Sequence, residues 1–207
     1  MIVAVDPGCT STDEAEQVLH VVAGLVGELL VRPTGSRETE LVGCTHVVRL
    51  AASHLAVTVG TPHHVDAPQR AMVERRLVAI TGARHVGAAM DGPGRPGPRT
   101  FGPGDLAEGA LSALQEGAGR TGGRLVLFPG GQGLAGRMSV DDVVRSSLID
   151  RVETAGGFPA APGGVVDVRG RLRPRWRDGR AVLVVRPTEP GDLAPLDPQE
   201  RLVGSAP

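Results

Sequence analysis

Residues 2–30 read IVAVDPGCTSTDEAEQVLHVVAGLVGELL, and this segment carries the clearest structural signal in the chain. Ile2 to Val5 is a short apolar run, which is typical of a buried strand. Ser11 to Glu14 matches a capping box, which marks the start of a helix. The apolar residues of this helix share one wide face, which indicates burial: Val18, Leu19, Val22, Leu25, Val26, Leu29 and Leu30. A buried strand followed by a buried helix predicts an α/β protein.

Strand and helix patterns continue to alternate after this first unit. The patterns predict these elements in chain order: one long strand or two short ones over 45–59, a helix over 68–76, a strand over 77–80, a helix capped by Asp105 with Glu108 and running to about Glu116, a strand over 124–128, and a helix from Ser139 to Gly156. The glycine- and proline-rich stretch 91–104 between them is expected to be a lid or a disordered loop.

A β-hairpin is predicted near the end of the chain. Residues 165–177 form its first strand, Asp178-Gly179 forms the turn, and residues 180–186 form its second strand. We therefore expect residues 1–187 to form a single α/β domain with a mixed sheet, interleaved helices and this C-terminal β-hairpin. Residues 188–207 are expected to form a proline-rich tail.

The composition excludes few classes of function. The chain has 207 residues, which suffice for one sizeable core, and its 22 basic and 23 acidic residues nearly balance. All the basic residues are arginine, and lysine, asparagine and tyrosine are absent, as expected of a bacterium with a G+C-rich genome. Arginine is then the default cation rather than a chosen one. The lack of lysine excludes Schiff-base chemistry and a P-loop lysine.

The compartment is predicted from the two cysteines and from the apolar runs. The N-terminus has no basic segment followed by a long apolar run, and no stretch approaches the roughly 18 apolar residues of a membrane span. We expect a cytoplasmic protein without membrane contact, whose Cys9 and Cys44 are reduced. Gly43-Cys44-Thr45-His46 is similar to the second cysteine motif of aspartate/glutamate racemases, but a buried, inert Cys44 is the favoured interpretation.

Alternating arginines mark the outward strand of the hairpin. They are Arg169, Arg171, Arg173, Arg175 and Arg177, and they share one face, whereas Trp176 points to the other. Pro174 cannot donate a ladder hydrogen bond, which predicts an edge strand. A solvated edge is the favoured interpretation. The alternative is a non-enzymatic module that binds nucleic acid or an acidic protein, although no aromatic side chain on the arginine face is there to stack bases.

Residues 131–136, GQGLAG, form a glycine-rich turn after the predicted strand 124–128. Gly131 and Gly133, with Arg137 and the backbone near Ser139, are candidates for binding an anion at a helix start. The acidic residue of a dinucleotide site is missing from its expected strand, so we reject that site.

Asp6 follows the first strand in VAVDPGCTST, residues 3–12. This stretch resembles the first phosphate motif of the actin-like ATPase and sugar-kinase families. The resemblance implies that Asp6 helps to hold magnesium and that the turn at Gly8 and Thr10 approaches phosphates. Those families continue into a second strand, whereas this chain enters a capped helix, so a strand, a turn and a helix cap are the alternative.

Two further turns carry histidine. TGARHVGAA, residues 81–89, is similar to the arginine-histidine turn that contacts ATP in diadenylate cyclases, which implies anion binding by Arg84 and His85. TPHHVDAP, residues 61–68, groups His63, His64 and Asp66. Imidazole and carboxylate suit zinc or another transition metal, with His46, His54 or His85 completing the set. A surface turn is the alternative to that metal site.

These turns lead to one hypothesis of function. If the sheet is parallel over the strands that precede Gly8, Arg84 and Gly133, the three turns share a rim that binds a nucleotide or another phosphorylated small molecule. Asp6 then holds Mg²⁺ or Zn²⁺, Arg84 and Arg137 neutralise phosphate, and His85 or His64 acts as the acid–base group. Three scattered turns would instead favour the arginine-lined module or a scaffold without a small ligand.

Overall fold

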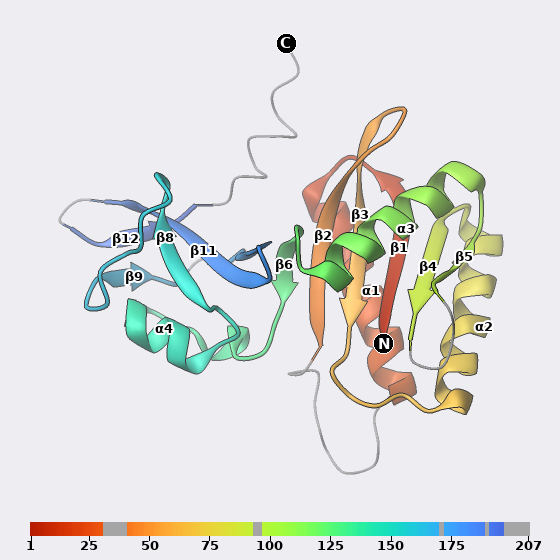
Figure 1. Ribbon diagram of the computed structural model, residues 1–207, viewed down its shortest axis with the longest axis horizontal. Coiled ribbons are helices and arrows are strands. Elements are labelled where there is room, and N and C mark those ends of the chain that lie inside the picture. Colours follow the sequence, from red (N-terminus) through yellow and green to blue (C-terminus); the bar gives the residue numbers. More distant parts are fainter. Residues whose placement is uncertain (31–40, 93–96, 170–171, 189–190, 197–207) are drawn as a thin grey trace.

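The computed structural model describes residues 1–30, 41–92, 97–169, 172–188 and 191–196 (Figure 1). In this part of the chain the α-helices are α1 (Thr12–Leu30), α2 (Ala67–Arg84), α3 (Gly104–Gly119) and α4 (Val140–Ser146). The strands are β1 (Ile2–Cys9), β2 (Val42–Arg49), β3 (Ser53–Gly60), β4 (Gly87–Asp91), β5 (Arg99–Phe101), β6 (Arg124–Leu127), β7 (Arg137–Ser139), β8 (Arg151–Thr154), β9 (Val165–Asp167), β10 (Arg175–Arg177), β11 (Arg180–Pro187) and β12 (Leu193–Pro195).

All these strands belong to one sheet. Its order is β5-β4-β1-β3-β2-β6-β10-β11-β12-β9-β7, and β8 lies beside β11. The pairs β8–β11 and β9–β12 are parallel and the other pairs are antiparallel, so the sheet is mixed. The expected α/β fold with interleaved helices, a mixed sheet and a C-terminal hairpin is confirmed.

The first half of the chain has the connectivity of two split βαβ units. The units are β1-α1-β2 and β3-α2-β4. In the strand order β4-β1-β3-β2, the strands β1 and β2 of the first unit flank β3, and the strands β3 and β4 of the second unit flank β1. Alternate residues of β1 point to opposite faces. Val3 and Val5 pack with α1 and α2, whereas Ala4 packs with α3 on the other face. Figure 1 shows this sheet between α1 and α3.

Small residues bring α3 close to its face of the sheet. Ala4, Ala56 and Ala89 on the strands meet Ala110 and Ala113 on the helix. Alanine faces allow close backbone approach, so this layer has little volume for large apolar side chains. Polar side chains of the sheet therefore lie directly under the helix: Asp6, His46, His54 and Thr58.

A second apolar core fills the other half of the molecule. Trp176 on β10 is 4% exposed and packs in one cluster with Leu125, Val143, Ile149 and Leu183. The single tryptophan thus points to the core, as its place among the alternating arginines predicted. Strand β6 joins the two halves, because it pairs with β2 on one side and with β10 on the other.

A buried ion cluster fastens this junction from the α1 side. We call it the Glu16 cluster: Glu16 on α1, Arg124 on β6 and Arg173 just before β10. Arg173 donates two hydrogen bonds to the Glu16 carboxylate, at 2.9 and 2.6 Å, and Arg124 donates one at 2.7 Å. The three side chains are at most 10% exposed. Burial raises the pKa of Glu16, but the arginine hydrogen bonds outweigh it and hold that pKa below its ordinary value.

The hairpin has the predicted turn but not the predicted outward strand. Asp178 and Gly179 take left-handed φ values of 51° and 77°, as a two-residue turn requires. Residues 165–177 are not one strand, because β9 and β10 are separate elements with different partners. The edge prediction is wrong, since β10 lies between β6 and β11. Pro174 fits there because it uses its acceptor: its carbonyl oxygen receives the Leu125 N–H at 2.7 Å.

Two expected helix and strand assignments are also wrong. Residues 77–80 are the last turns of α2, whose buried Val73, Leu77 and Thr81 recur every four residues along one helix face. The helix that Ser139 caps ends at Ser146, and residues 151–154 form β8 instead. There Val152 packs in the core beside β11, a partner that local periodicity does not reveal.

Two other boundaries differ from expectation. Helix α3 begins at Gly104 after Pro103 and has no side-chain cap, while Asp105 lies in its first turn. Residues 45–59 form the two strands of a β2–β3 hairpin, as one of the two interpretations had it. Part of the expected tail, Leu193–Pro195, is strand β12. No helix in the described residues is long and apolar enough to cross a membrane.

The buried charges of the Glu16 cluster make a stability prediction. Changing Glu16 to Gln leaves two buried guanidinium groups without their counter-charge, so the free energy of unfolding should fall by about 3–5 kcal/mol at neutral pH. Because the native pKa of Glu16 is lowered, its stabilising contribution is present above the unfolded carboxyl pKa of about 4.3 and is lost as pH falls through the native value. Urea denaturation at several pH values measures both effects.

Glu14→Gln on the same helix is the matched control. Glu14 is exposed in the first turn of α1, so its loss should cost about 1 kcal/mol or less. Equal losses in the two variants would show that the Glu16 cluster does not stabilise the junction.

Candidate functional site

The three glycine or arginine turns do not share one rim. Strand β1 is antiparallel to β4, and Asp6 pairs with Gly87, so the ends at Gly8 and at Arg84 lie at the same end of the sheet. Strand β6 is antiparallel to β2 and ends beside Gly43, at the opposite end. The Gly131–Gly133 turn that follows β6 is therefore remote from the other two, and the single-rim arrangement is wrong.

Asp6 is fully buried and hydrogen bonded within the protein. Its Oδ2 atom lies 2.7 Å from His54 Nε2, and its Oδ1 atom accepts the Gly8 N–H at 2.8 Å. The other ring nitrogen of His54, Nδ1, lies 2.9 Å from the Ala52 carbonyl oxygen. Both ring nitrogens of His54 therefore face acceptors, and neither is left to exchange a proton with a ligand.

The Asp6–His54 pair holds its proton more firmly than the separate groups would. Burial raises the pKa of Asp6. Burial also acts to lower the pKa of His54, but the hydrogen bonds to Asp6 and to the Ala52 carbonyl outweigh it, so that pKa is raised as well. The pair thus acts as a proton-holding link between β1 and β3 beneath α3.

The other histidine and acid candidates lie apart. His63 and His64 are exposed, and Asp66 caps α2, where it accepts the Gln69 N–H at 2.8 Å. His85 is the exposed C-cap of α2 with φ 50°, next to the exposed Arg84. The described residues hold no group of three or more histidine, cysteine or acidic side chains arranged to bind a metal ion.

The candidates for anion binding are also dispersed. Thr10 is exposed after β1. Gly131 and Gly133 lie in a short 3-10 helix, and Arg137 on β7 is paired with Asp192 at 2.6 Å. Ser139 caps α4, as predicted, and accepts the Asp142 N–H at 3.1 Å.

Acidic partners engage Arg169, Arg173 and Arg177 among the alternating arginines that the structure describes. Arg169 binds Asp167, Arg173 belongs to the Glu16 cluster, and Arg177 binds Glu153 at 2.8 Å. Arg175 lies on β10, and Arg171 lies outside the described residues. Paired cations offer less charge to a phosphate backbone than the sequence alone indicated.

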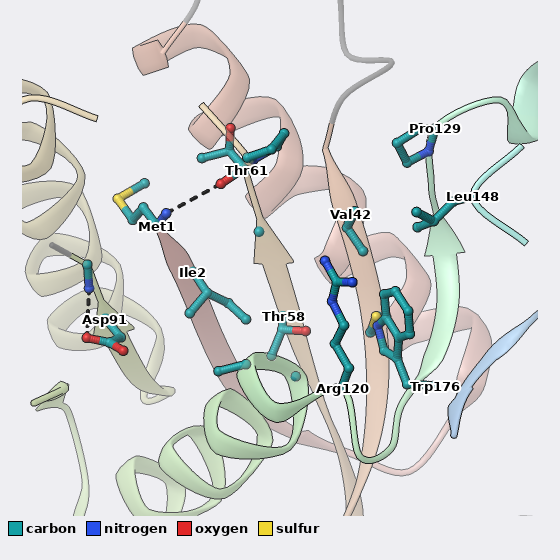
Figure 2. A pocket seen from close by; sticks show the side chains of 16 residues that line it. Met1, Ile2, Val42, Thr58, Thr61, Asp91, Arg120, Pro129, Leu148 and Trp176 are labelled. Carbon is teal, nitrogen blue, oxygen red and sulfur yellow. Dashed lines mark hydrogen bonds between the residues drawn. The ribbon is translucent and has the colours of Figure 1, made fainter. Parts of the chain in front are cut away.

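A cavity of about 610 Å³ lies where the two halves of the molecule meet (Figure 2). We call it the Thr58 cavity. Its apolar wall comes from both halves: Ile2, Val42, Pro129, Leu148 and Trp176. Its polar wall contains Cys44, Thr58, Thr61, Asp91 and Arg120. This volume lies in the range of pockets that hold small organic ligands.

Arg120 is held at this cavity by its backbone and by Trp176. It is the C-cap of α3 in the left-handed conformation, φ 51°, and its N–H bonds the last turn of the helix. Its guanidinium carbon lies 4.7 Å from the centre of the Trp176 ring, and Figure 2 shows the two side chains side by side. A left-handed non-glycine residue costs about 1 kcal/mol or more, and such strain is common at functional sites.

Thr58 in the cavity wall begins a hydrogen-bonded relay that leaves the cavity. Its Oγ1 atom lies 2.8 Å from His46 Nε2, and His46 Nδ1 lies 2.5 Å from Glu116 Oε2. Thr58 and His46 are 2% and 1% exposed, whereas the Glu116 side chain is 40% exposed. The relay therefore connects a buried hydroxyl at the cavity with a carboxylate that reaches solvent.

Cys44 and Trp176 extend the relay at its cavity end. The Cys44 thiol interacts with the side chains of both Trp176 and Thr58, and burial raises its pKa to about 12. We call the whole series the Trp176–Glu116 chain: Trp176, Cys44, Thr58, His46 and Glu116. The indole N–H can only donate and an ionised carboxylate can only accept, so Trp176 is a donor at one end and Glu116 is an acceptor at the other.

Two proton arrangements give the Thr58–His46 and His46–Glu116 hydrogen bonds one donor each. With neutral His46, Thr58 donates to Nε2 and Nδ1 donates to Glu116. With protonated His46, both ring nitrogens donate and Thr58 Oγ1 accepts. The two differ by one proton on Nε2, so His46 can take that proton without moving a heavy atom.

The surroundings of Glu116 favour its ionised form, which is the counter-charge for a protonated His46 ring. The hydrogen bond from His46 lowers the pKa of Glu116 more than burial raises it, and nearby Arg49 lowers it further. A second cavity of about 270 Å³, lined by Glu116 and Arg49 among others, lies on this side. The carboxylate is thus in contact with solvent and with a positive surrounding.

Glycines make room for His46 and for its partner Thr58. A Cβ atom on Gly123 would lie 2.5 Å from Cε1 of the His46 ring, and φ at Gly123 is +98°. A Cβ on Gly117 would lie 3.2 Å from Thr58 Oγ1. The glycine-rich segment after α3 therefore packs directly on the relay, and a side chain at 123 is excluded by both space and backbone conformation.

Sequence reasoning missed most of this site. His46 was considered only as a metal ligand, Cys44 as an inert thiol or a racemase-like cysteine, and Thr58, Glu116 and Arg120 not at all as site residues. The alternation of Cys44 and His46 on one strand was a visible signal of a shared face. Pairing with Thr58 and Glu116 comes from the β2–β3 register and from the path of α3.

Comparisons with protein-family models, with curated proteins and with solved structures gave no match to this chain.

The proton held by Asp6 and His54 should make stability depend on pH. Because the native pKa values are raised, the shared proton makes its full stabilising contribution to the free energy of unfolding below the unfolded histidine pKa of about 6.5. That contribution is lost as pH rises through the native value. His54→Gln should therefore lower the free energy of unfolding by about 1–3 kcal/mol at pH 6 and by less at pH 9. The matched control is His20→Gln, an exposed histidine on α1. A pH-independent loss in His54→Gln would contradict the shared proton.

Packing of Gly123 on the imidazole predicts a local distortion. Gly123→Ala should lower the free energy of unfolding by more than about 1 kcal/mol and change the ¹⁵N and ¹H shifts of the His46 ring, because the new methyl group meets that ring. Gly133→Ala is the control, since its Cβ would meet nothing within 4 Å. Unchanged His46 resonances in Gly123→Ala would show that the glycine does not shape the site.

Proposed function

We propose that the protein binds a small organic anion, such as a phosphorylated or carboxylated metabolite, in the Thr58 cavity. The observation that carries this proposal is Arg120, whose guanidinium is held on the Trp176 ring at the wall of a cavity of about 610 Å³. Guanidinium groups suit the planar, bidentate recognition of carboxylate and phosphate.

The remaining wall supports a ligand with an apolar body. Ile2, Val42 and Leu148 supply aliphatic surface, and Trp176 supplies an aromatic face. Thr58 and Thr61 are hydroxyl groups that can orient polar atoms of the ligand. Asp91, at another part of the wall, disfavours a second anionic group there, so the proposal is for one anionic end rather than two.

This site replaces the one expected at the strand-end turns, while the ligand class stays the same. A phosphorylated small molecule, a nucleotide included, remains within the proposal, with Arg120 in the role first given to Arg84 and Arg137. The arginine-lined module is less well supported, because Arg169, Arg173 and Arg177 are paired with acids. Reduced Cys9 and Cys44 are both free, which supports action in the cytoplasm.

Ligand-observed NMR titration tests the proposal with three matched probes: phenyl phosphate, benzoate and neutral phenol. We expect the two anions to bind at millimolar or lower Kd and phenol more weakly. Arg120→Gln removes a charge-assisted hydrogen bond worth about 1.5–3 kcal/mol, so anion affinity should fall by about 10- to 100-fold.

Arg180→Gln, in the exposed hairpin turn, is the control and should bind as the wild type does. The phosphate and carboxylate arms of the titration separate the two anion chemistries. Equal anion affinity in wild type and Arg120→Gln, or no binding of either anion, would refute the site.

A further inference from the structure

We infer that Thr58 is a nucleophile activated by His46, which makes the Thr58 cavity an acyl-transfer site for small esters. This inference rests on the proposed function, because the ester would occupy the same cavity as the organic anion. It goes further in assigning a reaction, an attacking atom and a general base.

The geometry is that of a nucleophile, a base and an orienting acid. Thr58 Oγ1 is 2.8 Å from His46 Nε2, within the range for proton transfer, and His46 Nδ1 is 2.5 Å from Glu116. The three side chains come from β3, β2 and α3, so the packing of rigid elements sets their relation. Hydroxyl, imidazole and carboxylate in this order define the general pattern of an activated nucleophile.

The proposed reaction passes through an acyl-threonine intermediate. Thr58 Oγ1 attacks the ester carbonyl carbon, forming a C–O bond, while its proton passes to His46 Nε2. The tetrahedral intermediate collapses, the bond to the leaving alkoxide breaks, and the alkoxide takes the proton from Nε2. Water then attacks the acyl-threonine with His46 again as the base, releasing the carboxylic acid and restoring the hydroxyl. The net reaction is ester plus water to acid plus alcohol.

Neighbouring groups complete the chemistry of the step. Glu116 faces the ring that becomes positive and stabilises it. Arg120 in the same cavity wall is a positive group available to negative charge on the former carbonyl oxygen.

Other nucleophile and base candidates in the described residues fit less well. Both ring nitrogens of His54 are engaged, by Asp6 and by the Ala52 carbonyl, so it has no free nitrogen for a hydroxyl. Cys44 lies in the same cavity wall, but its thiol is held protonated by burial and is a weak nucleophile in that form. Thr58 is the hydroxyl that has a base at hydrogen-bond distance and a place in the cavity wall.

Reaction with 4-nitrophenyl acetate tests the inference on the full chain. We expect release of 4-nitrophenolate with a burst and, on acid quench, one acetyl group (about 42 Da) on the peptide that contains Thr58, located by tandem mass spectrometry. Thr58→Val should abolish this adduct, and Thr58→Ser should retain it. Glu116→Gln should slow acetylation at least tenfold, because the imidazolium loses its counter-charge.

Thr81→Val is the matched control, since Thr81 is a buried threonine on α2 outside the site. It should be acetylated as fast as the wild type. Phenyl phosphate or benzoate should protect Thr58, because each competes for the cavity. Near-ultraviolet circular dichroism of each variant shows whether it is folded. If Thr58→Val does not fold, Thr58→Ser keeps the test valid.

The outcomes separate this inference from the proposed function. Acetylation of Thr58 that is lost in Thr58→Val and blocked by the anions supports both. Binding of phenyl phosphate or benzoate without acetylation of Thr58, or with equal acetylation in Thr58→Val, overturns the inference and leaves the binding site standing. Absence of both anion binding and acetylation overturns both.

Discussion

The Glu16 cluster is the contact on which the geometry of the Thr58 cavity depends. Strand β6 pairs with β2 at only three positions, yet it carries the whole second half of the chain alongside the first. Arg124 and Arg173 bind one carboxylate on α1 from the opposite face of that junction. They thereby fix β6 and β10 against the N-terminal strands, and with β10 they fix Trp176 against Cys44 and Thr58. The Glu16 cluster therefore holds the two walls of the Thr58 cavity at a fixed spacing, although its own residues do not line that cavity.

The small residues under α3 have a second effect on the site. A layer of alanine cannot fill space with apolar volume, so the sheet face beneath α3 holds two imidazole–carboxylate pairs. They differ in the partner of the second nitrogen. His54 faces a backbone carbonyl and is locked, whereas His46 faces a hydroxyl that can both donate and accept. That single difference separates a structural histidine from one suited to proton transfer.

Local patterns in the sequence were sufficient for the fold class but not for the site. The start of α1 after Ser11, whose Oγ accepts the Glu14 N–H, the Asp178-Gly179 turn and the inward Trp176 are set by residues close together in the chain, and the structure has all three. The apolar run at 77–80 suits a strand or a helix, and Val152 is a strand residue only because β11 lies beside it. Thr58, His46 and Glu116 are up to 70 residues apart. Their meeting depends on strand register and on the path of α3, which periodicity does not encode.

Trp176 gives this protein a built-in optical reporter. It is the chain's only tryptophan, and tyrosine is absent, so the near-ultraviolet emission of the whole molecule comes from one indole. The Arg120 guanidinium carbon lies 4.7 Å from the centre of that indole ring, the Cys44 thiol interacts with the same side chain, and a thiol quenches excited indole. Its brightness is therefore coupled to the position of that thiol in the cavity wall. Occupancy of the cavity and separation of the two halves can both be followed without a label.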